Sequence, residues 1–195
     1  MLKIGVLISG GGTNLQAIID GCVSKKIEAE VVVVLSNRLD AFGLQRSEKA
    51  GISNVGLSKK DFEDKGSYFR KITELLKAHE VDLVVLAGFL EILPETFVKS
   101  FEHKIINVHP SLIPKYAGKG YYGLKVHEAV IENKELYTGA TVHFVDGQVD
   151  TGQIIVQEAL KVLKVDTPET LQKRVLNIEH QLMIKSIDKY IKGEI

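Results

Sequence analysis

The 195-residue chain contains a single cysteine, Cys22, and its 25 basic residues are balanced by 25 acidic residues. One cysteine excludes an internal disulfide framework and any metal site built on a Cys-x-x-Cys pair. A net charge of zero supplies no field that would hold nucleic acid or an anionic membrane. We therefore expect small-molecule substrates rather than a nucleic acid or a membrane surface as partners.

Long apolar segments are also absent. The longest apolar stretch, residues 81–90, includes Asp82 and is much shorter than the ~20 residues that cross a bilayer. The apolar run at residues 4–8, which follows Met1, Leu2 and Lys3 directly, is too short for a signal peptide core with a cleavage site. With 45% hydrophobic residues, a chain of this length can bury a core of its own. These features predict a soluble cytoplasmic protein.

Apolar runs alternate with helical patterns in the first half of the chain. Continuous apolar runs are typical of parallel strands buried on both faces, and they occur at residues 4–8, 31–35 and 83–87. Residues 105–108 are predicted to form another strand. Amphipathic spacing and helix end signals predict helices over residues 14–22, 41–50, 67–80 and 94–100.

The second half has a different pattern. Residues 116–123 (YAGKGYYG) have the composition of a loop, and residues 124–133 follow as a predicted helix. Residues 141–145 and 154–160 predict two antiparallel strands around a turn at 146–152. Thr167 and Pro168 mark the start of a last helix. The chain is thus expected to be a single α/β domain over residues 1–195, Rossmann-like, with a mostly parallel twisted sheet, an antiparallel C-terminal strand and flanking helices.

A glycine-rich turn, residues 9–14 (SGGGTN), joins the first predicted strand to the first predicted helix. Backbone N–H groups at a helix N-terminus, uncovered by side chains, suit an anion such as phosphate. The dinucleotide fingerprint is incomplete, because Leu15 stands where a third glycine belongs and the second strand is followed by Asn37 and Arg38, with no acid for a ribose 2′-OH. Phosphate binding is favoured; the alternatives are a tight turn without a ligand and an NADP phosphate contacted by Arg38.

Asn107 and His109 stand at the end of a predicted strand, in the block NVHPSLIP. Two residues apart on extended backbone, they point to the same face, and ligands of open α/β sheets bind beyond the carboxyl ends of strands. An amide beside an imidazole can stabilise the oxyanion of an acyl transfer. A loop histidine without a function is the alternative.

Two carboxylates are further candidates. Asp150 lies in the turn at 146–152, where it either raises the pKa of a nearby imidazole or only accepts local backbone hydrogen bonds. Glu179 borders the apolar stripe of the last helix, formed by Leu171, Val175, Ile178 and Leu182. There it either contacts a ligand hydroxyl or extends into solvent.

Several motifs resemble those of a known family, in the same order over nearly the whole chain. They are residues 12–18 (GTNLQAI), 87–93 (AGFLEIL), 107–114 (NVHPSLIP), 139–145 (GATVHFV) and 149–152 (VDTG). This set resembles the folate-dependent formyltransferases, and the glycine turn and short chain resemble the phosphoribosylglycinamide formyltransferases among them. The resemblance implies transfer of the formyl group of 10-formyltetrahydrofolate to the amine of glycinamide ribonucleotide in purine biosynthesis, without a metal, by a monomer or homodimer.

The resemblance also implies roles for individual residues. Asn107, His109 and Asp150 would be the catalytic set. The substrate's phosphate would be bound by Gly12, Thr13 and Asn14, and its ribose hydroxyls by Glu179; the folate would contact Lys65, Leu90, Glu91, Ile92, Leu93 and Asn107. Two positions depart from the family pattern: Glu91 stands where many relatives are basic, and Gly147 stands where an acid is usual, which is expected to loosen the turn.

Other functions share part of this pattern. A methionyl-tRNA formyltransferase is expected to have a longer, more basic chain, and a formyltetrahydrofolate hydrolase an additional N-terminal module. A serine hydrolase could use Ser111, His109 and Asp150, but the chain has no Gly-x-Ser-x-Gly elbow. A non-catalytic nucleotide-binding protein would use the glycine turn alone.

Overall fold

The computed structural model describes all residues, 1–195, in two compact units, residues 1–106 and 107–195. Seven strands belong to one sheet with the order β3-β2-β1-β4-β5-β6-β7. The boundary between the units falls within β5 (Ile105–His109). That the whole chain works as one functional domain stays a prediction.

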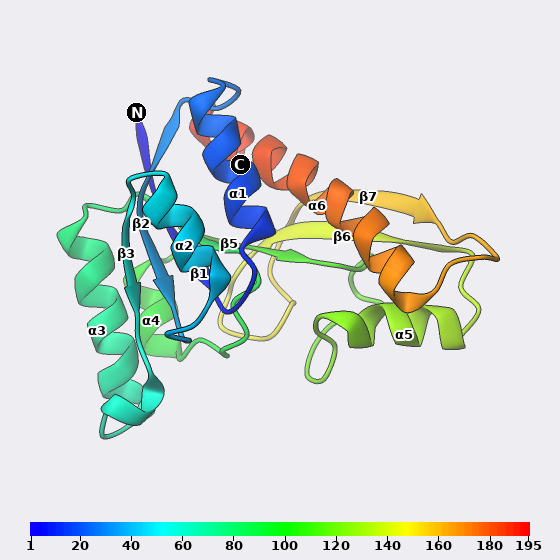
Figure 1. Ribbon diagram of the computed structural model, residues 1–195, viewed down its shortest axis with the longest axis horizontal. Helices are drawn as coiled ribbons and strands as arrows, with labels where there is room; N and C mark the ends of the chain where they lie inside the picture. Colours follow the sequence, from blue (N-terminus) through cyan, green and yellow to red (C-terminus); the bar gives the residue numbers. More distant parts are fainter. The chain divides into compact units, whose positions relative to one another are not determined.

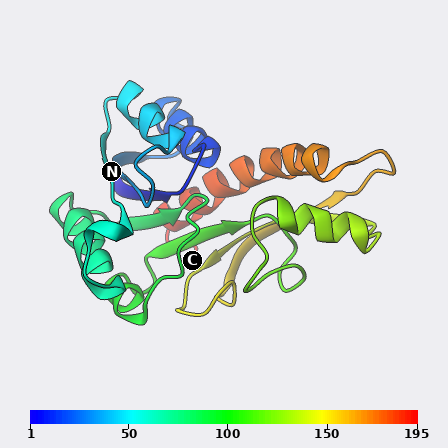
Figure 2. The same cartoon turned by 60° about the horizontal axis from the view of Figure 1, so that its bottom comes forward.

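The first unit alternates strands and helices. β1 pairs in parallel with β2 and β4, and β2 pairs in parallel with β3. Helices α1 and α2 lie on one side of these strands and α3 and α4 on the other (Figure 2). The elements are β1 (Leu2–Ile8), α1 (Thr13–Val23), β2 (Ala29–Ser36), α2 (Phe42–Lys49), β3 (Ser53–Gly56), a 3-10 turn (Lys59–Asp61), α3 (Lys65–Ala78), β4 (Leu83–Leu86) and α4 (Glu95–Ser100).

Local sequence explains where these elements begin and end. Ile4, Val6, Leu7 and Ile8 of β1 are completely buried, as expected for a strand covered on both faces. Helix α3 begins with a capping box, in which Asp64 accepts from the Ser67 N–H and the Ser67 hydroxyl accepts from the Asp64 N–H.

The strand order changes direction between β1 and β4, which is where ligands bind in open α/β sheets. The glycine turn leaves the carboxyl end of β1, and residues 87–93 leave the carboxyl end of β4. Two hydrogen bonds join these segments: the Ser9 N–H donates to the Gly88 carbonyl (3.1 Å), and the Leu90 N–H donates to Ser9 Oγ (2.9 Å). The two segments therefore form one edge of the first unit.

The second unit consists of α5 (Leu124–Glu132), β6 (Tyr137–Phe144), β7 (Ile154–Lys161) and α6 (Pro168–Ile191), together with the end of β5. Strands β6 and β7 pair antiparallel, and α6 runs along them (Figure 1). Thr167 caps α6 through a capping box with Thr170. The predicted stripe of α6, Leu171, Val175, Ile178 and Leu182, is buried.

The predicted α/β fold, with parallel strands first and an antiparallel strand near the C-terminus, is confirmed. Two details differ. β3 was not expected, and β6 begins at Tyr137, four residues before the predicted strand. Among the helices there is none with the length and apolar character needed to span a membrane.

Candidate active site

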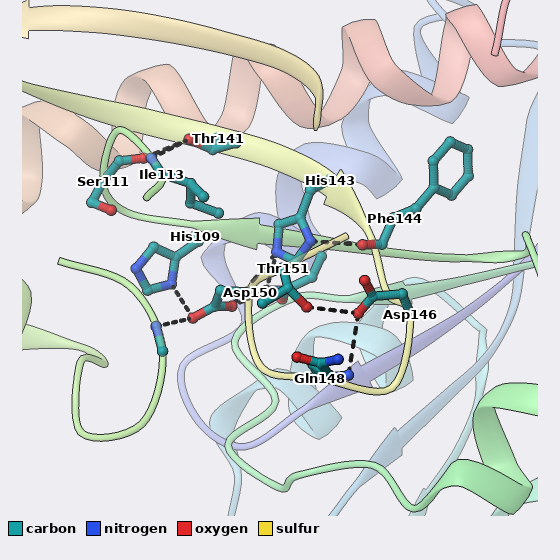
Figure 3. A network of polar contacts seen from close by, with 12 residues as sticks. His109, Ser111, Ile113, Thr141, His143, Phe144, Asp146, Gln148, Asp150 and Thr151 are labelled. Carbon is teal, nitrogen blue, oxygen red and sulfur yellow. Dashed lines mark hydrogen bonds and ion pairs between the residues drawn. The ribbon is translucent and has the colours of Figure 1, made fainter. Parts of the chain in front are cut away.

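Asn107 and His109 both reach Asp150 from the end of β5. His109 Nδ1 lies 3.4 Å from Asp150 Oδ2, and Asn107 Nδ2 donates to Asp150 Oδ1 over 3.5 Å. The two side chains therefore point to the same face, as their spacing predicted. Asp150 comes from the turn between β6 and β7, 41 residues after His109, and Figure 3 shows its carboxylate beside the imidazole.

The turn that carries Asp150 is tied to its own backbone and to the loop after β5. The Asp146 carboxylate accepts from the Gln148 N–H (3.1 Å) and the Thr151 hydroxyl (2.9 Å). Asp150 itself has a φ of 57°, and its Oδ2 accepts from the Gly118 N–H (2.9 Å). Its carboxylate is thus directed at distant residues rather than at local backbone. Gly147 has a φ of 97°, a conformation that suits glycine, so its place in the turn is compatible with a fixed Asp150.

Both ring nitrogens of His109 face oxygen atoms. Nε2 lies 2.7 Å from the Tyr116 carbonyl, which can only accept, so Nε2 carries a hydrogen. In the neutral ring Nδ1 is then bare and faces the Asp150 carboxylate. Protonation of the ring would place a second N–H toward that carboxylate.

Burial and the neighbouring groups shift the pKa of His109 in opposite directions. The residue is 5% exposed, and burial lowers its pKa below the usual 6.5, although the Asp150 charge and the Tyr116 carbonyl act in the opposite direction. Asp150 thus acts on the pKa of His109 in the expected direction, and burial outweighs it. Burial raises the pKa of Asp150, but His143, the charge of His109 and the Gly118 N–H outweigh it and hold that pKa below its usual range.

His143 is a member of this cluster to which the sequence motif assigned no role. Its Nδ1 donates to the Phe144 carbonyl (2.7 Å), which leaves Nε2 free to accept from Asn107 Nδ2 (3.2 Å) in the neutral ring. Nε2 also lies 3.6 Å from Asp150 Oδ1. The sequence feature that could have identified His143 is its position near the carboxyl end of a strand whose other residues are mostly apolar.

Ser111 does not form a hydrolase triad with His109. Its hydroxyl is buried and donates to the Lys115 carbonyl (2.6 Å), and its own carbonyl accepts from the Thr141 hydroxyl (2.6 Å). The same threonine oxygen accepts from the Ile113 N–H (Figure 3). Ser111 and Thr141 thus hold the loop that follows β5.

The predicted phosphate-binding residues lie at the start of α1. Gly12 has a φ of 69°, and no side chain caps the helix and no acid stands in its first turn. Uncapped N–H groups and the positive end of the helix dipole favour an anion. Arg38, considered above for an NADP phosphate, instead makes a two-pronged contact with Asp40.

The predicted folate segment carries exposed apolar side chains. Leu90 is 59% and Ile92 52% exposed, whereas Leu93 is buried. Glu91 is neutralised locally: Lys59 Nζ donates to its Oε2 (2.8 Å) and Asn37 Nδ2 to its Oε1 (3.0 Å). Lys65, the basic residue expected near the folate, lies at the start of α3 with its ammonium 5.8 Å from the Phe69 ring centre.

Glu179 lies on α6 in the second unit and is only 7% exposed. The alternative in which this carboxylate extends into solvent is therefore wrong.

The structure brings together Asn107, His109 and Asp150. The glycine turn, Lys65 and residues 90–93 belong to the first unit. No group of three or more histidine, cysteine, aspartate or glutamate side chains is arranged to hold a metal ion.

Comparison with known proteins agrees with this geometry. The family model described as formyl transferase matches residues 2–187. The chain is 39% identical over 194 residues to phosphoribosylglycinamide formyltransferase of Escherichia coli (strain K12), covering 100% of this chain and 89% of that protein. It is 39% identical over 186 residues to the chloroplastic enzyme of that name from Arabidopsis thaliana, covering 95% of this chain.

Solved structures give the same result. Glycinamide ribonucleotide transformylase 1 from Symbiobacterium toebii has a TM-score of 0.94 and 40% identity, over 99% of this chain and 89% of that one. The chain spans only 64% of the Arabidopsis thaliana protein and 60% of its Vigna unguiculata counterpart. The family match covers most of the chain, and the chain therefore belongs to the formyl transferase family.

Proposed function

We propose that the protein transfers the formyl group of 10-formyltetrahydrofolate to the amine of glycinamide ribonucleotide, giving formylglycinamide ribonucleotide and tetrahydrofolate. The observation that carries the proposal is the contact of Asn107 and His109 with Asp150 in a member of the formyl transferase family. Relatives and solved structures that are named for this activity support the choice of acceptor.

The proposed reaction is a direct transfer. The neutral amine attacks the formyl carbon, a nitrogen–carbon bond forms, and the formyl oxygen becomes an oxyanion. Asn107 Nδ2 and His109 Nε2 are the donors for that oxygen. Because Nε2–H now meets the Tyr116 carbonyl, the formyl oxygen takes the place of this carbonyl. Its negative charge raises the pKa of His109, so protonation accompanies the reaction, and Asp150 receives the second N–H.

The intermediate then breaks the bond between the formyl carbon and N10 of the folate. The amine loses one proton and N10 gains one, so the exchange is balanced. We assign this transfer to a water molecule held by Asp150, whose lowered pKa keeps it ionised.

The binding roles follow the family positions. Gly12, Thr13 and Asn14 bind the phosphate at the uncapped start of α1, and Glu179 binds the ribose hydroxyls. The exposed Leu90 and Ile92 give an apolar surface for the folate, whose pterin contacts are made largely by main-chain groups of residues 90–93. The family positions also assign folate contacts to Lys65 and Asn107. We further propose a cytoplasmic monomer or homodimer that uses no metal.

Incubating the protein with glycinamide ribonucleotide and 10-formyltetrahydrofolate, and following the appearance of tetrahydrofolate, tests the proposal. Loss of formyl groups from the folate in the absence of glycinamide ribonucleotide, at the same rate, would identify a hydrolase instead. If neither arm shows a reaction, both activities are contradicted. The remaining alternative is then a nucleotide-binding protein without catalytic activity.

Removing either oxyanion donor should lower kcat strongly. We expect Asn107→Ala and His109→Ala each to reduce kcat by about 10²–10³-fold, the typical effect of losing one such donor. Gln148→Ala, an exposed change in the adjacent turn, serves as the control and should keep wild-type kcat. Near wild-type turnover of either alanine variant would contradict the assignment.

A further inference from the structure

The carbonyl groups of the glycine turn are held from one side by α2. The Gly10 carbonyl accepts from the Gly43 N–H (3.0 Å), and the Gly11 carbonyl accepts from Arg46 Nε (2.8 Å). In a trans peptide the C=O and the next N–H point in opposite directions. Fixing these two carbonyls on α2 therefore turns the N–H groups of Gly11 and Gly12 away from α2.

This arrangement depends on a close approach of two glycines. A Cβ on Gly12 would lie 2.7 Å from the Gly43 Cα, and a Cβ on Gly43 would lie 2.3 Å from Ile8 Cδ1. A side chain on Gly12 would push α2 away from the turn, and one on Gly43 would displace the end of Ile8 and lie only 3.3 Å from the Gly12 Cα. With both positions glycine, α2 comes near enough for Arg46 to reach the Gly11 carbonyl.

The guanidinium of Arg46 is fixed at more than one point. Besides the Gly11 carbonyl it donates from Nη1 to Gln16 Oε1 (3.2 Å) and lies 5.1 Å from the Phe42 ring centre. Gln16 is in α1, so Arg46 connects the turn, the first helix and α2. A cavity of about 400 Å³ lies beside it, lined by Gln16, Phe42, Arg46, Lys49 and Ala50. The planar fork of arginine can make both hydrogen bonds at once, which a lysine ammonium on a flexible stem does not reproduce.

We propose that Arg46 is a positioning residue for phosphate recognition. It sets the glycine turn so that the N–H groups of Gly11 and Gly12 face the phosphate, and it acts through this geometry rather than through its charge. The inference rests on the proposed function, because it requires the turn to bind the substrate's phosphate.

Arg46→Ala should raise the KM for glycinamide ribonucleotide roughly tenfold, the size expected for loss of a hydrogen bond to a charged donor, and leave kcat within about twofold. The KM for the folate should not change. Arg46→Lys should resemble Arg46→Ala, because it restores the charge and not the paired hydrogen bonds. Lys49→Ala removes a neighbouring charge that has no contact with the turn, and it should behave as wild type.

Binding without catalysis separates this inference from the proposed function. We would titrate the full chain and its variants with ribose 5-phosphate and follow the amide NMR signals of Gly11, Gly12 and Thr13, with thermal unfolding to verify the fold. Wild type should shift these signals, and both Arg46 variants should bind about tenfold more weakly.

Each result is decisive. Wild-type affinity in Arg46→Lys would show that charge suffices, and wild-type affinity in Arg46→Ala would remove any role; both overturn the inference. Wild-type protein whose turn amides do not respond would also overturn it. Protein that binds ribose 5-phosphate as expected but transfers no formyl group would refute the proposed function while leaving the role of Arg46 in place.

Discussion

His109 is the residue whose chemistry depends most on its neighbours. Burial disfavours its charged form, and Asp150 and the Tyr116 carbonyl favour it. The balance leaves the ring uncharged at neutral pH with a hydrogen already on Nε2. A negative oxygen near Nε2 would shift that balance toward the charged ring, which is what the proposed reaction requires.

Removing the Asp150 charge should lower the pKa of His109. Asp150 is the charge that raises this pKa, so Asp150→Asn leaves burial unopposed by it. NMR titration of the ring gives the pKa directly. Asp146→Asn, which alters a carboxylate of the same turn without a contact to His109, is the matched control. An unchanged His109 pKa in Asp150→Asn would show that the two groups are not coupled.

At the scale of elements, the hairpin of β6 and β7 positions the acidic member of the site. The turn at 146–152 is closed by a hydrogen bond from the Phe144 N–H to the Gln153 carbonyl (2.9 Å). Gly152 packs against the Phe144 carbonyl, where an added Cβ would lie 1.8 Å from that oxygen. The place of Asp150 therefore depends on a residue without a side chain two positions later.

Gly152→Ala should disturb both stability and activity. The clash with backbone must be relieved by moving the turn, and we expect the free energy of unfolding to fall by about 1–3 kcal/mol. Because Asp150 moves with the turn, kcat should fall as well. Urea unfolding and steady-state kinetics measure the two effects, with the exposed Val149→Ala as control. Full activity in a destabilised Gly152→Ala would mean that the turn does not determine the position of Asp150.

Sequence patterns predicted the elements that have strong local signals. β1 and β4 were predictable because they are continuous apolar runs, and α6 because Thr167 and Pro168 start it. β3 was missed because its four residues are exposed or half-buried and form a strand only through pairing with β2. Long-range pairing of this kind leaves no periodic pattern in the sequence.

The candidate site was also predictable only where the signal is local in the sequence. The spacing of Asn107 and His109 predicted a shared face, but the contact with Asp150 depends on how the later hairpin folds back. The net direction of the His109 pKa could not be predicted, since it depends on burial. His143 was missed because a histidine in a strand has the same local pattern whether or not it contacts a site.

At the scale of the whole molecule, buried imidazoles link stability to pH. Burial lowers the pKa of His109 and His180, and burial followed by the charge of His109 lowers the pKa of His127 to about 4. His127 is 1% exposed, and its Nδ1 has no hydrogen-bond partner. Each of these rings favours the neutral form in the folded protein, so acid should weaken the fold.

The contribution of His127 can be measured. Between pH 6.5 and about 4 the His127 ring is protonated in the unfolded chain but not in the folded chain. The free energy of unfolding therefore falls as pH falls through this range. The full difference is about 3 kcal/mol. Urea unfolding at neutral pH and near pH 4 should show that His127→Gln loses less stability on acidification than wild type, by about this amount.

His103→Asn, a change at an exposed turn position, is the control for that experiment. It should keep the wild-type loss of stability on acidification. Equal acid sensitivity of His127→Gln and wild type would show that the buried ring at 127 does not titrate with folding.

Two independent conditions meet at position 150. The backbone there adopts a φ of 57°, which favours glycine, asparagine and aspartate, and the site contains an anionic oxygen from the same residue. Glycine adopts this φ but has no carboxylate, and asparagine adopts it but has no charge. Glutamate has the charge but does not favour this φ. Aspartate meets both conditions, so we expect a substitution at position 150 to change either the backbone of the turn or the charge beside His109.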